Sequence, residues 1–167
     1  DAMSLCVWDP KFSVGIEDID KQHKRLIEYV NELDEASRTH DLQDIYHVLV
    51  HLRDYTVYHF AFEEKLMKEA HYPMLEEHKR IHQAFVGRVR YFKEHYERGE
   101  DITDQLMIEL RAWLINHIQN TDSDYAHDIQ QMLEDREKQE KQEAQPVAAP
   151  EKKQHWFFLF WSKLFKK

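Results

Sequence analysis

Seven side chains that are able to bind metal ions occur at helical spacing in four separate segments of this 167-residue chain. They are five histidines, one glutamate and one aspartate: His23, His59, Glu63, His78, His82, His117 and Asp122. A helix turns by about 100° per residue, so two residues four apart face nearly the same way. His59 and Glu63 therefore form one clamp, and His78 and His82 form another. Imidazole and carboxylate ligands suit iron, zinc, copper or manganese, and seven of them suit a carboxylate-bridged pair of ions.

The candidate ligands lie on the apolar stripes of their segments, where a helix packs into a core. The four stripes are Ile19, His23, Leu26, Val30 and Leu33; Ile45, Val48, Leu52, Tyr55, His59, Phe62 and Leu66; Leu75, His78, His82, Phe85, Val89, Phe92 and Tyr96; and Leu106, Leu110, Trp113 and His117. Unrelated surface histidines would not follow these stripes. We therefore expect the ligands to point into a shared interior.

The pattern predicts an all-α fold, an antiparallel up-down-up-down four-helix bundle with a C-terminal extension. The expected helices are 18–38, 41–68, 73–98 and 102–120. The expected boundary residues are Asp41 and Asp101 as N-caps, Pro73 in a first turn and Gly99 as a stop. Short connections make neighbouring helices antiparallel. The ligands near the starts of the first and third helices then meet those near the finishes of the second and fourth at one end of the bundle.

The pair His117 and Asp122 requires a local irregularity. Five residues correspond to about 140° on a regular helix, which would aim the two side chains apart. The apolar register runs to His117 and resumes at Asp122 and Tyr125, as though one residue had been inserted. We therefore expect a bulge around Gln119 to Thr121, and bulges of this kind often occur at functional sites.

Four ordered motifs resemble the metal-binding motifs of the hemerythrin family, and of its single-domain bacterial members in particular. The motifs are IDKQH (Ile19 to His23), HFAFEE (His59 to Glu64), HKRIH (His78 to His82) and WLINHIQNTD (Trp113 to Asp122). The resemblance covers residues 7–133. It implies a four-helix bundle with a non-haem di-iron centre that binds O2 reversibly, for storage or delivery, in a protein that is not an enzyme.

The resemblance also implies a division of the ligands between two iron ions that change between Fe2+ and Fe3+. By this carry-over, three histidines hold one iron: His78, His82 and His117. His23 and His59 hold the other iron, which keeps an open position for O2. Glu63 and Asp122 bridge the two ions beside an oxo or hydroxo group.

The chemistry of the residues favours a carrier over an oxygenase. The core stripes carry no pair of Glu-x-x-His motifs of the kind found in ferritin-like di-iron bundles. Trp113 and Leu114 match pocket positions of the family and would keep the O2 site dry, although ordinary core packing explains them equally well. The alternative functions are sensing or scavenging of O2, NO or iron, and peroxide or NO redox chemistry at the same centre.

Two further candidates are weaker. His47 and His51 are also four residues apart, but they lie beside the apolar stripe, so we expect a solvated flank and not a second metal site. Glu64 is expected to be a solvated neighbour of Glu63. The alternative is that it supports a metal ligand without binding the metal itself. The remaining histidines are expected in loops, on the surface or in the tail: His40, His71, His95, His127 and His155.

Composition divides the chain into a bundle at residues 1–133, a charged, proline-containing linker at 134–150 and an aromatic, basic tail at 151–167. The stretch Glu134 to Gln145 is either a solvated helical extension or disordered. The single cysteine, Cys6, excludes an internal disulfide. Because the start also lacks a secretory signal, we expect a cytoplasmic protein.

The tail differs from everything before it. Residues 151–167 have a formal charge of +4, against −13 for residues 1–150. The apolar run Trp156 to Trp161 is far shorter than the ~20 residues that a membrane-spanning helix needs. We expect the tail to lie at an anionic membrane surface, at the inner face of a membrane, or to dock into an O2-consuming partner protein. Packing on the bundle of its own or a neighbouring subunit is the alternative, and no nucleic-acid partner is expected.

Overall fold

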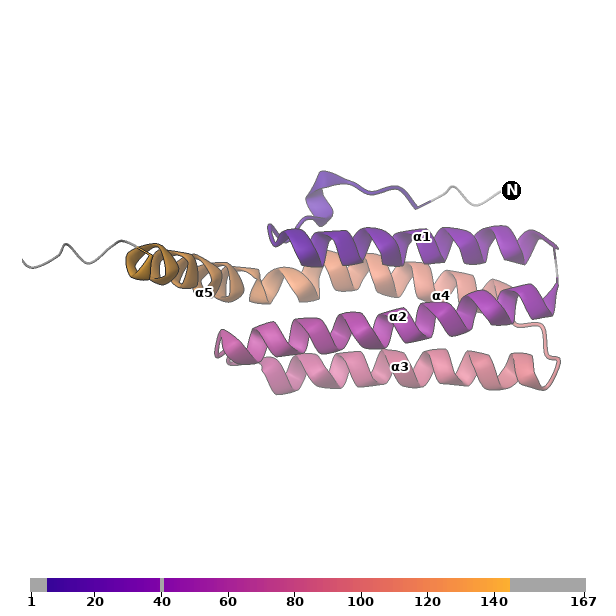
Figure 1. Cartoon of the computed structure of the whole chain (residues 1–167). Coiled ribbons are helices and arrows are strands. Elements are labelled where there is room, and N and C mark those ends of the chain that lie inside the picture. Colours follow the sequence, from indigo (N-terminus) through magenta and orange to yellow (C-terminus); the bar gives the residue numbers. More distant parts are fainter. Residues whose placement is uncertain (1–5, 40, 145–167) are drawn as a thin grey trace, which may run out of the picture. The chain divides into compact units, whose positions relative to one another are not determined.

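The protein is an antiparallel four-helix bundle, as the sequence predicts. The computed structural model describes residues 6–39 and 41–144. Its elements are η1 (Pro10–Phe12), α1 (Glu17–Thr39), α2 (Leu42–Glu69), α3 (Leu75–Glu97), α4 (Thr103–Asn116), η2 (His117–Thr121) and α5 (Asp122–Glu143). The connections alternate between the two ends of the bundle (Figure 1). Helix α1 packs on α2 and α4, and α2 packs on α3. No strand occurs among the described residues.

The predicted boundaries are confirmed at two positions. The side chain of Asp41 accepts hydrogen bonds from the backbone N–H groups of Gln43 and Asp44, which caps α2. Gly99 follows the end of α3 with a φ of +76°, a left-handed conformation that glycine adopts without strain.

The other two predicted boundaries are wrong by one or two residues. Pro73 precedes the N-cap Met74 and lies in the turn before α3, not in its first helical turn. Asp101 lies one residue before the N-cap Ile102. Its carboxylate instead accepts hydrogen bonds from both the backbone N–H and the hydroxyl of Thr103, so it stabilises the helix start from outside the cap position.

The predicted bulge is present and is longer than expected. A π-helical turn, η2, covers all five residues from His117 to Thr121 and connects α4 to α5 without a break in the helical backbone. A π turn holds one extra residue, which restores the apolar register, so Tyr125 and Ile129 are buried. The N-terminal turn η1 contacts η2 and buries Phe12. Because α5 continues the helical backbone to Glu143, the predicted end of the fourth helix at residue 120 is wrong.

Two apolar clusters enclose the predicted ligand positions. The larger cluster fills the bundle interior and includes Leu26, Leu52, Phe85, Leu110 and Leu114. The smaller cluster comprises Val14, Ile16, Ile19, Met67, Tyr125 and Ile129. In α1, Ile19 belongs to the smaller cluster and Leu26 to the larger, with His23 between them in the sequence. The ligands thus form a polar layer between two apolar ones.

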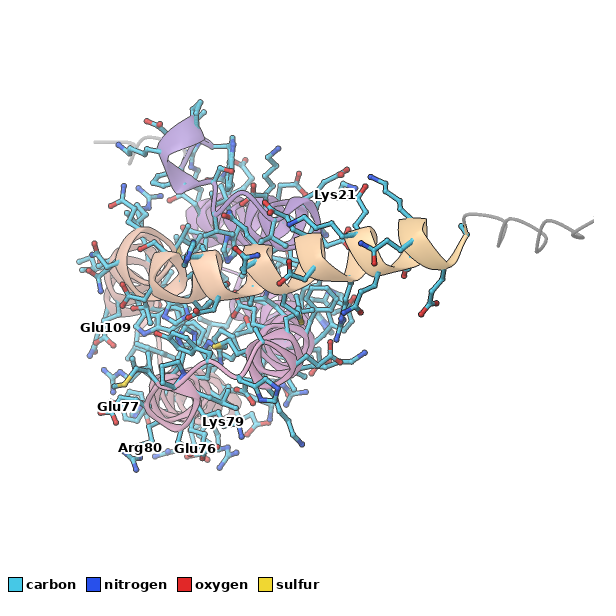
Figure 2. The ribbon with its side chains drawn as sticks, turned by 90° about the vertical axis from the view of Figure 1, so that its left-hand side faces the viewer. Lys21, Glu76, Glu77, Lys79, Arg80 and Glu109 are labelled. Carbon is cyan, nitrogen blue, oxygen red and sulfur yellow. The ribbon has the colours of Figure 1, made fainter. Side chains whose placement is uncertain are left out.

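The outer face of α3 shows why its histidines point inward. Lys79 and Arg80 pair with Glu76 and Glu77 through contacts of 2.9 and 3.0 Å, and Figure 2 shows all four side chains on the outside of the bundle. His78, which lies between them in the sequence, is only 3% exposed. The charged residues hold this face in water, so the other face of the helix enters the core.

The described residues up to Glu134 form one compact unit, and the described residues from Asp135 onward belong to a second. Of the two alternatives for residues 134–145, the structure shows a helix as far as Glu143. Its residues 135–143 are exposed, and Lys141 pairs with Glu137 one turn earlier. Several predictions fall outside the described residues: the tail at 151–167, the linker residues 145–150 with both of their prolines, His40 and His155. In the described part of the chain, no helix is long and apolar enough to cross a membrane.

Gly15 provides a test of how the N-terminal segment is held. Its φ is +73°, and a Cβ built there lies 2.5 Å from Nε2 of Gln130, which donates a hydrogen bond to the carbonyl of Val14. We expect Gly15→Ala to lower the free energy of unfolding by about 1 kcal/mol or more, measured by urea denaturation. The matched control, Gly87→Ala in α3, meets no atom within 4 Å and should stabilise by about 0.4–1 kcal/mol. Equal effects of the two substitutions would contradict this account.

Candidate metal centre

The fold brings all seven predicted ligands together. Helix α1 contributes His23, α2 contributes His59 and Glu63, and α3 contributes the pair His78 and His82. The remaining two, His117 and Asp122, come from η2 and the start of α5. None of the seven is more than 3% exposed. The ligand layer is therefore sealed from bulk solvent.

The ligand atoms fall into two sets with two members in common. The first set is Glu63, His78, His82, His117 and Asp122, and the second is His23, His59, Glu63 and Asp122. Within each set, the ligand atoms all lie within 4.8 Å of one another. Because both carboxylates belong to both sets, the geometry describes two adjacent cation positions with Glu63 and Asp122 between them.

The π turn brings the last two ligands together. Nε2 of His117 lies 2.9 Å from Oδ1 of Asp122, although the two residues are five apart in the sequence. On a regular helix this separation would place them about 140° apart. The extra residue in η2 therefore serves the ligand geometry as well as the apolar register.

Many ligand atoms in this layer lack the hydrogen bonds that buried polar atoms normally make. The buried atoms without a hydrogen-bond partner include Nε2 of His23, His59 and His78, Oε2 of Glu63 and both carboxylate oxygens of Asp122. Nε2 of His23 lies 3.1 Å from Oδ2 of Asp122, yet neither atom makes a hydrogen bond. Such atoms are costly to bury unless something else satisfies them. Lone pairs that converge on a common point fit a metal ion.

The electrostatics of the layer follow from burial and from the two carboxylates. Burial alone would lower the pKa of His23, but its contacts with Asp122 and Glu63 outweigh burial and raise this pKa to about 9. Burial lowers the pKa of His59 to about 4 against the opposing charge of Glu63. Burial would raise the pKa of Glu63 and Asp122, yet the neighbouring histidines hold both below their ordinary values. The carboxylates therefore stay ionised, and a cation would replace the proton on His23.

A search against protein-family profiles matches residues 14–129 to the family described as "Hemerythrin HHE cation binding domain". The chain belongs to the hemerythrin family. A bacteriohemerythrin of Stenotrophomonas maltophilia is 42% identical over 131 residues, which cover 78% of this chain and 86% of the relative. A bacteriohemerythrin of Pseudomonas aeruginosa is 39% identical and covers 80% of this chain and 90% of the relative. A solved wild-type hemerythrin structure superposes with a TM-score of 0.71 at 30% identity, covering 75% of this chain and 98% of that chain.

The residues present fit the cofactor of a hemerythrin, a non-haem di-iron centre. Five imidazoles and two carboxylates are nitrogen and oxygen ligands that iron accepts. The two carboxylates shared between the sets match a bridged pair of ions. Cations at these two positions would also oppose the two buried negative charges, which the neighbouring histidines compensate only in part.

Sequence reasoning missed two residues that contact the ligands of this hemerythrin. Gln22 of α1 is 7% exposed, and its Oε1 lies 2.8 Å from Nδ1 of His59. The fully buried Tyr125 donates a hydrogen bond to Oε1 of Glu63. Burial, together with the charges of Glu63 and Asp122, raises the pKa of Tyr125 well above its ordinary value, so it remains a donor. The register placed Tyr125 in the core, but it gave no signal for either contact.

Glu64 takes the alternative role considered from the sequence. It is not in either ligand set. Its Oε1 lies 2.8 Å from Nδ1 of His82, on the side of the ring opposite the metal position. The side chain is 27% exposed, so it contacts both solvent and a ligand histidine.

Trp113 and Leu114 both pack in the larger apolar cluster beside the ligand layer. The Trp113 ring stacks on His117 with centroids 4.2 Å apart and on Phe85 at 3.7 Å. Leu114 is 5% exposed and lines a small internal cavity with Leu26, Val30, Leu52, Thr56, Phe85, Leu110 and Trp113. The hydroxyl of Thr56 donates its proton to the carbonyl of Leu52, so it cannot donate a hydrogen bond to a molecule in the cavity.

The remaining described histidines lie outside the metal centre. His47 and His51 are exposed on α2, which confirms the solvated flank. His71 and His127 are exposed as well. His95 is 17% exposed and contacts Glu100 at 2.5 Å, near the end of α3. None of these residues belongs to either ligand set.

Proposed function

We propose that this hemerythrin binds O2 reversibly at its di-iron centre and stores or delivers it. The observation that carries the proposal is the sealed layer of seven ligands, in two sets that share Glu63 and Asp122. Bound iron supplies the change between Fe(II) and Fe(III) that accompanies O2 binding. The chain supplies fixed ligands and an apolar enclosure that limits the access of water.

We assign the ligands to the two ions according to these sets. The first ion is held by His78, His82 and His117, and the second by His23 and His59, with Glu63 and Asp122 shared. The second ion then has one protein ligand fewer than the first. That difference leaves room for O2 beside His23 and His59.

A small apolar cavity beside the ligand layer supports this location. Two of its lining residues, Leu26 and Thr56, each lie one helical turn from a histidine of the second ion, His23 and His59 respectively, and a third, Leu114, lies one turn from His117. The wall offers apolar groups and a hydroxyl already bonded to the backbone. The cavity is only about 10 Å³ in volume, and a water molecule would lose hydrogen bonds against its apolar wall. O2 would enter it only as the lining side chains move apart.

The ligand shell favours a carrier over a sensor, a scavenger or a redox enzyme. Five imidazoles and only two carboxylates form a shell of low negative charge, which does not stabilise the highly oxidised iron states that attack substrates. The direct test follows the absorption spectrum of the reduced protein as air is admitted and then removed. A spectrum that returns to its reduced form over repeated cycles supports storage or delivery. Irreversible oxidation in the first cycle supports the redox alternatives instead.

Ligand substitutions test the metal assignment. The parent protein should bind two irons per chain after anaerobic reconstitution. We expect His78→Ala or His117→Ala to lose at least one of them. The loss of a ligand that satisfies buried partners should also lower the free energy of unfolding by about 1–3 kcal/mol. Iron analysis and thermal unfolding measure the two effects.

His47→Ala is the matched control, because His47 has a helical histidine partner of its own but lies exposed on α2. It should retain two irons and the parent's stability. A parent protein that holds one zinc and takes up no iron would refute the assignment.

Leu114 tests whether the cavity wall protects the centre. We expect Leu114→Ala to retain both irons, because Leu114 is not a ligand, and to admit water into the cavity. Oxidation of the oxygenated protein to the diferric form should then accelerate by about tenfold, which corresponds to ~1.4 kcal/mol in the barrier. Ile108→Ala on the same helix is the control, since Ile108 is 63% exposed. An unchanged rate in the Leu114 variant would contradict the protective role.

We further propose that residues 151–167 bring the protein to an anionic membrane surface or to an O2-consuming partner. Two tryptophans and several other large apolar side chains are gathered in this segment. Burial of each stabilises by roughly 1.5–3 kcal/mol. The five lysines add about 1 kcal/mol each near anionic lipid, and this part weakens with salt.

Deletion of residues 151–167 tests this role. Iron content and O2 binding should be unchanged, because all seven ligands precede the deleted segment. Whichever the full chain shows, co-sedimentation with anionic vesicles or pull-down of a partner protein, should be lost or weakened in the deletion. If neither form binds vesicles or partners and only the deletion changes the oligomeric state, the tail is a self-association element and the proposal fails.

A further inference from the structure

Two of the ligand histidines make hydrogen bonds through Nδ1, and the side chains that accept these bonds differ in charge. Nδ1 of His59 lies 2.8 Å from the amide oxygen of Gln22. Nδ1 of His82 lies 2.8 Å from a carboxylate oxygen of Glu64. Neither oxygen can donate a hydrogen bond, so each imidazole donates through Nδ1 and keeps the lone pair of Nε2 for the metal position. The distances are equal, and the difference between the two contacts is one negative charge.

The two histidines belong to different ligand sets. His59 is in the set that contains His23, and His82 is in the set that contains His78 and His117. Among the described residues, no other ligand histidine has a carboxylate bonded to its Nδ1, and Nδ1 atoms of His23 and His117 have no hydrogen-bond partner. The negative charge therefore acts on one metal position more than on the other.

A carboxylate behind a ligand imidazole makes that imidazole a stronger electron donor. A stronger donor, with a negative charge close by, stabilises Fe(III) relative to Fe(II). We propose that Glu64 and Gln22 make the two irons electronically unequal, with Glu64 holding the His82 iron at the lower reduction potential. This inference rests on the proposed di-iron function and identifies the residues that tune it.

The surroundings of the two residues set the expected size of the effect. Glu64 and His82 both line a groove between α2 and α3, together with Val57, Phe60, Ala61, Gln83, Val86, Gly87 and Arg90. The Glu64 side chain is 27% exposed, so water screens part of its charge. Gln22 is 7% exposed, and a carboxylate placed there would be screened less. A charge added at Gln22 should therefore change the potential at least as much as a charge removed at Glu64.

The test uses a pair of matched substitutions, Glu64→Gln and Gln22→Glu, and the variant that carries both. Each exchange alters the charge of one contact and nearly preserves the size of the side chain. The irons are titrated with redox mediators, each Fe(III) taking one electron from the reductant to become Fe(II). We expect Glu64→Gln to raise the potential of the His82 iron and Gln22→Glu to lower that of the His59 iron. Each change should be about tenfold in the Fe(III)/Fe(II) ratio, or ~59 mV for one electron.

The double variant supplies a readout that a purely structural role would not produce. It has the same net charge as the parent, but the carboxylate has moved from one set to the other. Mössbauer spectra of half-reduced, iron-57-loaded protein identify which iron is reduced first. We expect the His59 iron to be reduced first in the parent and the His82 iron to be reduced first in the double variant.

Iron content and the unfolding of the metal-free protein serve as controls. If Glu64→Gln does not retain two irons, Gln22→Glu decides the question alone. Unchanged potentials in variants that hold two irons, or the same order of reduction in the parent and the double variant, would overturn the proposal. If the variants show these shifts but the parent protein does not release O2, the proposed function is refuted and this inference stands.

Discussion

The burial of seven polar ligand side chains between two apolar clusters is the constraint on which the rest of this structure depends. Two carboxylates and five imidazoles lie in a layer sealed from solvent, and many of their atoms have no hydrogen-bond partner. Such an arrangement would be strongly destabilising if the groups had only one another. Two cations would remove this cost, because the converging lone pairs would serve as metal ligands. The fold is therefore coupled to its cofactor.

Several features of the chain preserve the geometry of this layer. The π turn η2 aligns Asp122 with His117, and the N-terminal turn η1 contacts it. Tyr125 donates to one shared carboxylate, and Gln22 and Glu64 orient two of the imidazoles. These contacts come from five different helices or turns. The position of each ligand thus depends on the packing of the whole bundle end.

Much of the fold and of the centre could be predicted from the sequence, because the signals are local and periodic. The stripe that carries His59 and Glu63 indicates a helix and also the direction in which its ligands point. The register shift after His117 indicated the bulge, although not its full length of five residues. Pro73 and Asp101 were misplaced because a cap depends on turn geometry beyond the residue type. Gln22 could not be identified, since the residue of α1 that meets His59 depends on how two helices cross.

The central claim is that these seven side chains hold two iron ions with Glu63 and Asp122 between them. A crystal structure of the iron-loaded protein, with anomalous scattering recorded at the iron edge, tests it most directly. The account predicts two iron peaks, one bonded to His78, His82 and His117, the other to His23 and His59, and both bonded to the two shared carboxylates. A single metal ion, or a second ion bound away from Glu63 and Asp122, would contradict it.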